Sequence, residues 1–292
     1  MKRSLLPALI LISICGMGQE ERPIPIADSV QPIAEIVIKG YESQRRILET
    51  PASVGFISSG DLQRFSNTSL VPVFNSVPGV RMEERSPGSY RLSIRGSLLR
   101  SPFGVRNVKV YWNDIPFTDG GGNTYINLVD MNTVSRVVVL KGPGGSVYGA
   151  NTGGVIILND NDSLNPARGR NYTPHQFRVQ LNGGSYSQLG DNLQWSYRNK
   201  NFRSVLSQTH LQSDGYRANS RLRKDVVQWT GDTHLSEKDK LQWIAMYANL
   251  YYQTPGGLTL QQMKNDPTQA RPGTAVMPGA SEQKAAVYNK TL

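Results

Sequence analysis

The residues that could carry out chemistry are few and widely separated. The three histidines, His175, His210 and His234, have no HExxH or CxxC pattern beside them, and such patterns are the usual zinc-binding spacings. The glycine-rich segment 142–149 lacks the Lys-Ser/Thr ending of a phosphate-binding loop and the spacing of a dinucleotide-binding motif. We therefore expect no catalytic site, no metal site and no cofactor, so the protein is not expected to be an enzyme.

The composition favours a β-rich protein with many turns. Of 292 residues, 38% are apolar and 18% are charged, and glycine (28) and proline (17) are frequent. The net charge of +10 invites a nucleic-acid interpretation. The basic residues are scattered along the chain, however, so we do not expect a nucleic-acid partner.

The first 18 residues have the pattern of a secretory signal peptide. Lys2 and Arg3 precede an apolar run, Leu5–Ile14, and the small residues Gly16 and Gly18 follow it. A membrane anchor, or a lipoprotein modified at Cys15, are the alternatives. The apolar run is too short to span a bilayer, and no later run approaches 18 residues. Only a β-barrel would then place the exported chain in a membrane.

Two segments of different texture follow. Residues 19–49 are predicted to be an extended tether, with a β-prone island at 34–40, and residues 50–160 a compact α/β domain. In this domain we expect a helix near residues 59–65, capped by Ser59 or Asp61, and a second across 70–74. Glycine-rich turns separate the expected strands, which cover residues 90–95, 105–112, 134–141 and 154–159.

After Asp160 the apolar residues begin to alternate with polar ones. Phe177, Val179 and Leu181 alternate with polar residues, and so do Leu193 and Trp195, as in a transmembrane β-ribbon. We predict five strands, at 176–183, 187–197, 202–212, 225–235 and 240–252. Five strands cannot close a barrel, so we expect the segment 161–292 to be only the beginning of one.

Five motifs occur in a fixed order over about 80 residues. They are Val77–Val80, Leu92–Gly96, Val108–Pro116, Val134–Pro143 and Val147–Ile156. Together they resemble the plug domain of TonB-dependent outer-membrane receptors. The strands behind them resemble the start of that family's 22-stranded barrel, whose lumen the plug fills. The expected fold is a mixed α/β plug followed by antiparallel transmembrane β-strands.

The resemblance also implies roles for individual plug residues. The structural motif would comprise Arg95, Gly96, Lys141, Gly142, Pro143, Tyr148, Gly149, Gly153 and Gly154. In the family, basic plug residues face acidic residues inside the barrel, so Arg95 and Lys141 would have partners beyond residue 292. Lys141 stands where the family often has arginine, which keeps the charge without the bidentate fork.

A short N-terminal box in this family couples the receptor to TonB, an energy-coupling protein of the inner membrane. Glu35, Ile36, Val37 and Ile38 resemble that box. An exposed β-prone stretch on a tether can add itself as a strand to the edge of a partner's sheet. The alternative is that 35–38 is simply the first strand of the plug. The resemblance places the protein in the outer membrane of a Gram-negative type of cell, in contact with its lipid.

The expected ligand is a ferric chelate, either a siderophore or ferric citrate. Segment Gln253–Thr259 resembles one in ferric-citrate receptors. Cations in a lumen suit an anionic chelate, and the candidate substrate-binding residues are Arg100, Phe103, Arg106, Arg217 and Arg221. Solvated loop charges, or contacts of these cations with lipopolysaccharide, are the alternative interpretation. Other open alternatives are cobalamin or an oligosaccharide as the substrate, and a non-transporting fragment or secreted plug-like module.

Overall fold

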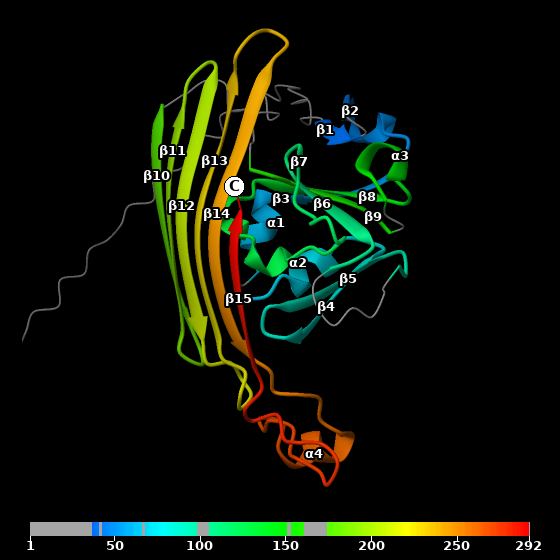
Figure 1. Cartoon of the computed structure of the whole chain (residues 1–292), viewed down its shortest axis with the longest axis vertical. Helices are drawn as coiled ribbons and strands as arrows, with labels where there is room; N and C mark the ends of the chain where they lie inside the picture. The colour runs from blue at the N-terminus through cyan, green and yellow to red at the C-terminus, as the bar shows by residue number, and fades with distance from the viewer. Residues whose placement is uncertain are drawn as a thin grey trace, which may run out of the picture. The chain divides into compact units, whose positions relative to one another are not determined.

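The structure, a computed structural model, has an α/β part up to Asp160 and an antiparallel sheet after it (Figure 1). It describes residues 37–40, 43–65, 68–97, 105–150, 153–160 and 174–291. The predicted signal peptide, 1–18, and most of the predicted tether lie outside these residues. No helix in the described ranges combines the length and the apolar character that a membrane-crossing helix needs.

A five-stranded sheet forms the centre of the α/β part. Its strands in spatial order are β3 (Ser53–Ser58), β8 (Arg136–Lys141), β9 (Gly154–Asn159), β6 (Val108–Trp112) and β7 (Ile115–Pro116). β6 and β9 run parallel, and the other neighbours are antiparallel. The runs Val137–Leu140 and Val155–Leu158 are buried throughout. Continuous apolar strands of this kind are typical of a sheet covered on both faces.

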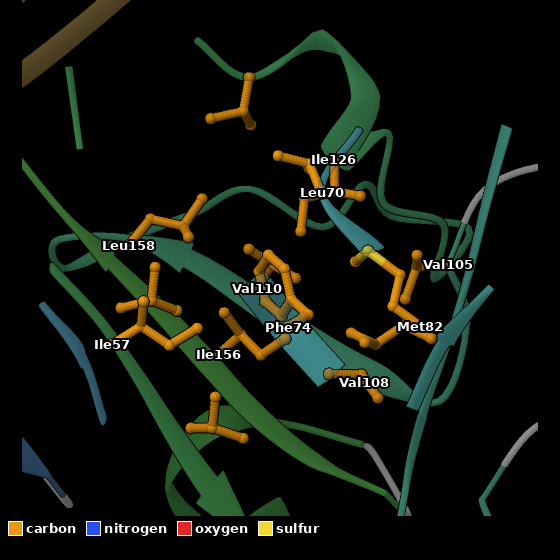
Figure 2. Close-up of a cluster of buried hydrophobic side chains, with 14 of the residues drawn as sticks. Ile57, Leu70, Phe74, Met82, Val105, Val108, Val110, Ile126, Ile156 and Leu158 are labelled. Carbon is orange, nitrogen blue, oxygen red and sulfur yellow. The ribbon is translucent and has the colours of Figure 1, made fainter. Parts of the chain in front are cut away.

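Two short helices and a hairpin cover one face of this sheet. They are α1 (Ser59–Gln63), α2 (Val71–Asn75), and the strands β4 (Val80–Ser86) and β5 (Ser89–Ile94). Figure 2 shows Phe74 of α2 among Val110 and Ile156 of the sheet, with Met82 of β4 nearby. The shorter elements are β1 (Val37–Gly40), β2 (Ser43–Arg46), η1 (Ile47–Glu49), η2 (Ile126–Leu128), η3 (Met131–Thr133) and α3 (Gly145–Tyr148).

The cap of α1 differs from the prediction. Ser58, rather than Ser59 or Asp61, is the N-cap residue, and Asp61 is the third residue of the helix. The Ser58 hydroxyl accepts from the Asp61 N–H, and the Asp61 carboxylate accepts from the backbone N–H of Ser58. Hydrogen bonds from the Ser58 side chain and backbone lower the pKa of Asp61. Both residues thus form a capping box that begins one position earlier than expected.

The antiparallel sheet is a meander of six strands, which lie side by side in Figure 1. They are β10 (His175–Gly184), β11 (Gln188–Arg198), β12 (Phe202–Ser213), β13 (Leu222–His234), β14 (Lys240–Gln253) and β15 (Lys284–Thr291). The prediction of five strands was therefore one too few. In β15 the apolar residues Ala285, Ala286 and Val287 are consecutive, so the alternation that revealed the other strands is missing there.

The two faces of this sheet differ in their surroundings. Leu211, Val226, Met246 and Leu250 are buried and pack against Leu128 of the α/β part. The opposite face leaves large apolar side chains exposed, among them Phe177, Val179, Leu181, Leu193, Trp195, Leu206, Val227, Trp229 and Tyr247. Alternation of this kind, with one face on a protein interior and an apolar outer face, is typical of a membrane-spanning β-sheet.

The turn between β8 and β9 needs glycines, as predicted. Gly142, Gly149 and Gly154 all have positive φ, at 124°, 79° and 140°. At Gly154 a Cβ atom would also collide with the carbonyl oxygen of Leu140 on the neighbouring strand. This position therefore has both a conformational and a steric reason to be glycine.

We expect Gly154→Ala to lower the free energy of unfolding by about 1–3 kcal/mol, because it adds backbone strain at a buried strand. The matched control is Gly145→Ala, where a Cβ meets no atom within 4 Å and φ is ordinary for an L-residue. Urea unfolding of the full chain in detergent, followed by tryptophan fluorescence, measures both. Equal stability of the two variants would contradict the steric argument.

Candidate functional site

The three histidines do not form a site in the structure. His175 stacks on Trp195, His210 pairs through Nδ1 with Asp225, and His234 ends β13. Among the described residues, no group of three or more His, Cys, Asp or Glu side chains could hold a metal ion. The chemically distinctive groups instead lie where the α/β part contacts the inward face of the six-stranded sheet.

A buried ion triad joins the end of β9 to this sheet. Arg203 of β12 donates from Nη2 to Asp160 Oδ1 at 2.8 Å, and from Nε to Asp232 Oδ1 at 2.6 Å. The side chains of Arg203 and Asp160 are only 6% and 1% exposed. Asp160 also accepts from Trp112 Nε1 at 3.3 Å and from Asn113 Nδ2 at 2.8 Å. One carboxylate thus ties three separate parts of the fold together.

A second polar cluster surrounds Asp130, at the start of η3. Asp130 Oδ2 accepts from Thr209 Oγ1 at 2.6 Å and from Asn192 Nδ2 at 3.2 Å. Its other oxygen accepts from the backbone and side chain of Asn132. Asp130, Asn192 and Thr209 are all buried. A carboxylate buried with several donors holds its surroundings in one arrangement, because each lost bond leaves a polar group unpaired.

Two further contacts extend this cluster along β13. Lys224 Nζ donates to the carbonyl oxygen of Val129 at 3.3 Å, and Gln228 Nε2 donates to Thr133 Oγ1 at 3.3 Å. Lys224 is therefore part of β13 and faces the α/β part, whereas the predicted strand began only at residue 225. The signal that could have revealed it is parity, since Lys224, Val226 and Gln228 share the face opposite to Val227 and Trp229.

The predicted structural-motif residues come together in part. Arg95 and Gly96 follow β5, both with positive φ, and Lys141 ends β8. Burial, and then the positive charge of Arg95, lower the pKa of Lys141. Two cations are thus held close to each other at the β8–β9 turn. Their expected acidic partners beyond residue 292 stay a prediction.

The remaining motif residues line the same turn. Pro143 and Gly144 lead into α3, where the ring of Tyr148 is nearly buried and stacks edge-on against Tyr111. The Tyr111 hydroxyl donates to the carbonyl oxygen of Tyr148 at 3.0 Å. Gly153 lies close to Ser97, so a side chain there would collide with the Ser97 hydroxyl. These contacts give the motif a packing role.

The predicted box is only partly described. Glu35 and Ile36 lie outside the described residues, whereas Val37 and Ile38 begin β1, which pairs with β2. Ile38 is fully buried among Val138, Leu140 and Ile157. A buried side chain is unavailable to a partner in this state, so this geometry favours the alternative of a first plug strand for Val37 and Ile38. The box remains a prediction for Glu35 and Ile36.

Of the candidate ligand-binding cations, Arg217 is occupied by the protein itself. Its guanidinium donates to the carbonyl oxygens of Gln269, Gly256 and Pro255 at 2.7–3.3 Å. Asn219 Nδ2 likewise donates to Thr254 and Gln283, at the two ends of the segment between β14 and β15. Arg217 and Asn219 therefore clamp that long loop, which contains α4 (Leu260–Asn265).

Of the other candidates, Arg221 lies in the same loop as Arg217, whereas Arg106 belongs to the plug. Arg106 Nε donates to Asn123 Oδ1 at 2.6 Å, and Arg221 pairs with Asp214 at 3.2 Å on an exposed loop. Arg100 and Phe103 lie outside the described residues. A hollow of about 580 Å³ in the loop after β12 is lined by Asp214, Tyr216, Arg217, Asn219 and Arg221, among others. Arg217 and Arg221 thus share one hollow, which Arg106 does not line, and both arginines are already engaged by protein acceptors.

We expect Arg203→Met to destabilise the full chain by about 3–5 kcal/mol, because it leaves Asp160 buried without its cation and leaves Asp232 with only Lys240, whose Nζ is 3.7 Å away. The matched control is Arg81→Met, which breaks an ion pair with Glu83 whose side chains are 74% and 38% exposed. Such a pair contributes at most about 1 kcal/mol. Unfolding in urea measures both, and Arg203→Met combined with Asp160→Asn and Asp232→Asn should recover part of the loss. Similar losses for Arg203→Met and Arg81→Met would contradict a structural role of the triad.

Comparisons with known proteins agree with this architecture. Residues 46–156 match the family model of the TonB-dependent receptor plug domain. A vitamin B12 transporter of Vibrio vulnificus is 27% identical over 133 residues, which are 44% of this chain and 21% of that protein. The chain therefore spans about a fifth of the length of this curated relative.

Solved structures show the same fold. The unliganded ferric citrate transporter FecA superposes with a TM-score of 0.61 and 19% identity, over 80% of this chain and 37% of FecA. The Pseudomonas aeruginosa receptor FpvA, bound to a ferric pyoverdine, gives a TM-score of 0.55 and 18% identity, over 74% and 27% of the two chains. Residues 46–156 thus match the plug domain of TonB-dependent receptors, and the strands after them have the fold of the beginning of such a receptor's barrel.

Proposed function

We propose that this chain acts in an outer-membrane receptor that takes up an anionic ferric chelate, either a ferric siderophore or ferric citrate. The observation that carries the proposal is the plug packed by buried polar groups against one face of a sheet whose other face is apolar. A plug fixed inside a membrane-spanning wall blocks passive flow. A substrate that is scarce outside the cell then needs specific binding and an energy source to pass.

The outward apolar face supports a place in the outer membrane. Trp195, Trp229 and Trp243 lie on that face together with Tyr197 and Phe202. The rings of Tyr197, Phe202, Trp243 and Trp229 contact one another in that order, and Trp195 stacks on His175. Aromatic girdles mark the interfaces of membrane β-barrels. The predicted signal peptide would deliver the chain to the secretory route that leads there.

A ferric chelate is supported by solved structures with this fold and by a cation of the plug. Solved structures with this fold include a ferric citrate transporter and a ferric pyoverdine receptor. The segment Gln253–Thr259 resembles a segment of ferric-citrate receptors. In this segment, the carbonyl oxygens of Pro255 and Gly256 accept hydrogen bonds from Arg217. The plug loop carries Arg106, whose Nε donates to Asn123, and the rest of such a guanidinium can bind a carboxylate of a chelate.

The distribution of anchors suggests how the plug responds to force. The polar anchors, Asp130 and Asp160, follow the middle of the plug sequence, whereas β1, β2 and β3 precede it. β3 is an edge strand that pairs only with β8 among the described strands, and β1 is held by the apolar packing of Ile38. A pull from a TonB-type protein on the N-terminal segment therefore meets the weakest contacts first. The N-terminal elements move, and the anchored part stays against the wall.

Cobalamin is the second candidate, favoured by the vitamin B12 transporter among the curated relatives. Uptake of radiolabelled ferric citrate, ferric siderophores and cobalamin by cells that express the whole protein, and lack their own receptors, separates the two. We expect uptake of a ferric chelate that stops when the membrane is uncoupled. Cobalamin uptake alone would replace the proposed substrate, and no energised uptake of any of them would refute a transport function.

The role of the box can be tested apart from the packing of Ile38. We expect Ile36→Pro to abolish energised uptake and leave ligand binding at the cell surface intact, because proline removes an N–H that strand addition requires. Ile38→Val, which keeps an apolar side chain in the buried position, is the control and should keep both activities. Uptake that survives Ile36→Pro would count against the box, and loss of both activities would indicate a damaged plug.

A further inference from the structure

The outward face of the sheet changes from apolar to charged along its strands. Successive outward residues of β14 are Leu241, Trp243, Ala245 and Tyr247, followed by Asn249 and Tyr251. Cross-strand neighbours follow the same change, since Asp225 pairs in register with His210 and Asn249, and Arg223 with Gln212 and Tyr251. The apolar belt therefore ends at the row of His210, Asp225 and Asn249.

The height of this belt matches the hydrocarbon layer. From Leu241 to Asn249 the strand covers roughly 26 Å at about 3.3 Å per residue. A tilt of ~35–45° reduces this to about 20 Å, close to the apolar band of ~25 Å in outer-membrane barrels. The charged row then lies at the level of lipid headgroups, on the side of the long loops.

A hollow of about 410 Å³ lies directly beyond this row. It is lined by Gln212, Arg221, Arg223, Asn249 and Tyr251. Gln212, Arg223, Asn249 and Tyr251 belong to the outward face, because their strand neighbours Leu211, Leu222 and Leu250 are buried against the plug. The hollow therefore faces the lipid side of the sheet, away from the plug.

The two arginines of the hollow retain free donors. Arg223 uses Nε for Asp225 at 3.1 Å, and Arg221 uses Nε for Asp214 at 3.2 Å. Asp225 is also engaged by His210. Within the described part of the chain, the Nη groups of Arg221 and Arg223 donate to no protein acceptor. Each carboxylate thus orients an arginine and leaves the ends of its guanidinium fork for another anion.

We infer that this hollow binds the phosphorylated headgroup of an outer-leaflet glycolipid. The inference rests on the proposed function, because it requires the sheet to lie in the outer membrane. A phosphate accepts two parallel N–H bonds from a guanidinium, and Tyr251, Asn249 and Gln212 supply the hydroxyl and amide groups that sugar hydroxyls bind. Arg221 was predicted from the sequence to bind the transported substrate, and in this inference it binds the lipid instead.

The test uses the full protein extracted from membranes in mild detergent. The probe is a diphosphorylated disaccharide lipid added in micelles, and native mass spectrometry measures its affinity. The variant is Arg221→Gln with Arg223→Gln, and the control is Lys238→Gln with Lys264→Gln, which removes two other exposed cations. The same lipid without phosphates, and inorganic phosphate as a competitor, are measured alongside.

We expect the arginine variant to bind the phosphorylated lipid roughly tenfold more weakly or worse, since hydrogen bonds to charged groups are lost. The control should bind like the wild type, and removal of the phosphates should abolish the difference. Equal affinity of variant and wild type would overturn the inference, and so would inorganic phosphate binding as tightly as the lipid. Loss of chelate uptake with unchanged lipid affinity would return the arginines to the transported ligand.

This outcome is separable from the proposed function. If wild-type protein is absent from outer-membrane fractions, or shows no energised uptake, the proposed function fails. If it is present and transports but the arginine variant keeps its lipid affinity, only the lipid site is wrong.

Discussion

The buried triad of Asp160, Arg203 and Asp232 is the interaction that fixes the plug against the six-stranded sheet, β10–β15. An ion pair removed from water is costly unless every charge keeps a partner, so this arrangement tolerates little displacement. Asp160, which follows the central strand β9, is also bonded to Trp112 and Asn113, which belong to or follow the neighbouring strand β6. A shift of the six-stranded sheet would therefore disturb the centre of the five-stranded sheet of the plug as well. Because an unpaired buried charge is costly, the triad holds the five-stranded sheet of the plug and the six-stranded sheet in one arrangement.

The polarity of this interface decides which parts of the plug can move. Apolar contacts, such as those of Leu128 with Leu211 and Leu250, resist separation but permit sliding, because they lack direction. The hydrogen bonds of Asp130 and Asp160 permit neither, since geometry limits them to one register. Among the described residues, the side chain of Ile38 packs against the central sheet by contacts of the first kind. The plug thus combines directional hydrogen bonds near its C-terminal end with apolar packing of Ile38 near its N-terminal end.

The sequence predicted those elements of the fold that depend on patterns of neighbouring residues. Alternation located β10–β14, and the ordered motifs around Gly142 and Gly154 located the plug. β15 was missed because its apolar residues are consecutive, and the helix cap was placed one residue late because Ser58 and Ser59 are chemically alike. Arg203, Asp130 and Asn192 carried no local signal, since each has an ordinary neighbourhood in the sequence and acquires its partners only through long-range packing. Parity on a strand would have separated inward Lys224 from outward Arg223, but only once the strand's start was known.

Arg217 and Arg221 show why composition cannot assign ligand-binding cations. Both are arginines of the same loop, so the sequence alone cannot distinguish a structural role from a ligand-binding role for either residue. The guanidinium of Arg217 is surrounded by carbonyl oxygens of the loop it clamps, and the bonds that hold it there leave little for a ligand. Arg221 has one acidic partner and solvent around it. The difference arises because the loop after β14 returns to the loop after β12 and offers its carbonyls to one arginine only. Whether an arginine of this loop serves structure or recognition is therefore decided by the number of acceptors that the fold brings to it. For Arg217 those acceptors come from the separate loop between β14 and β15.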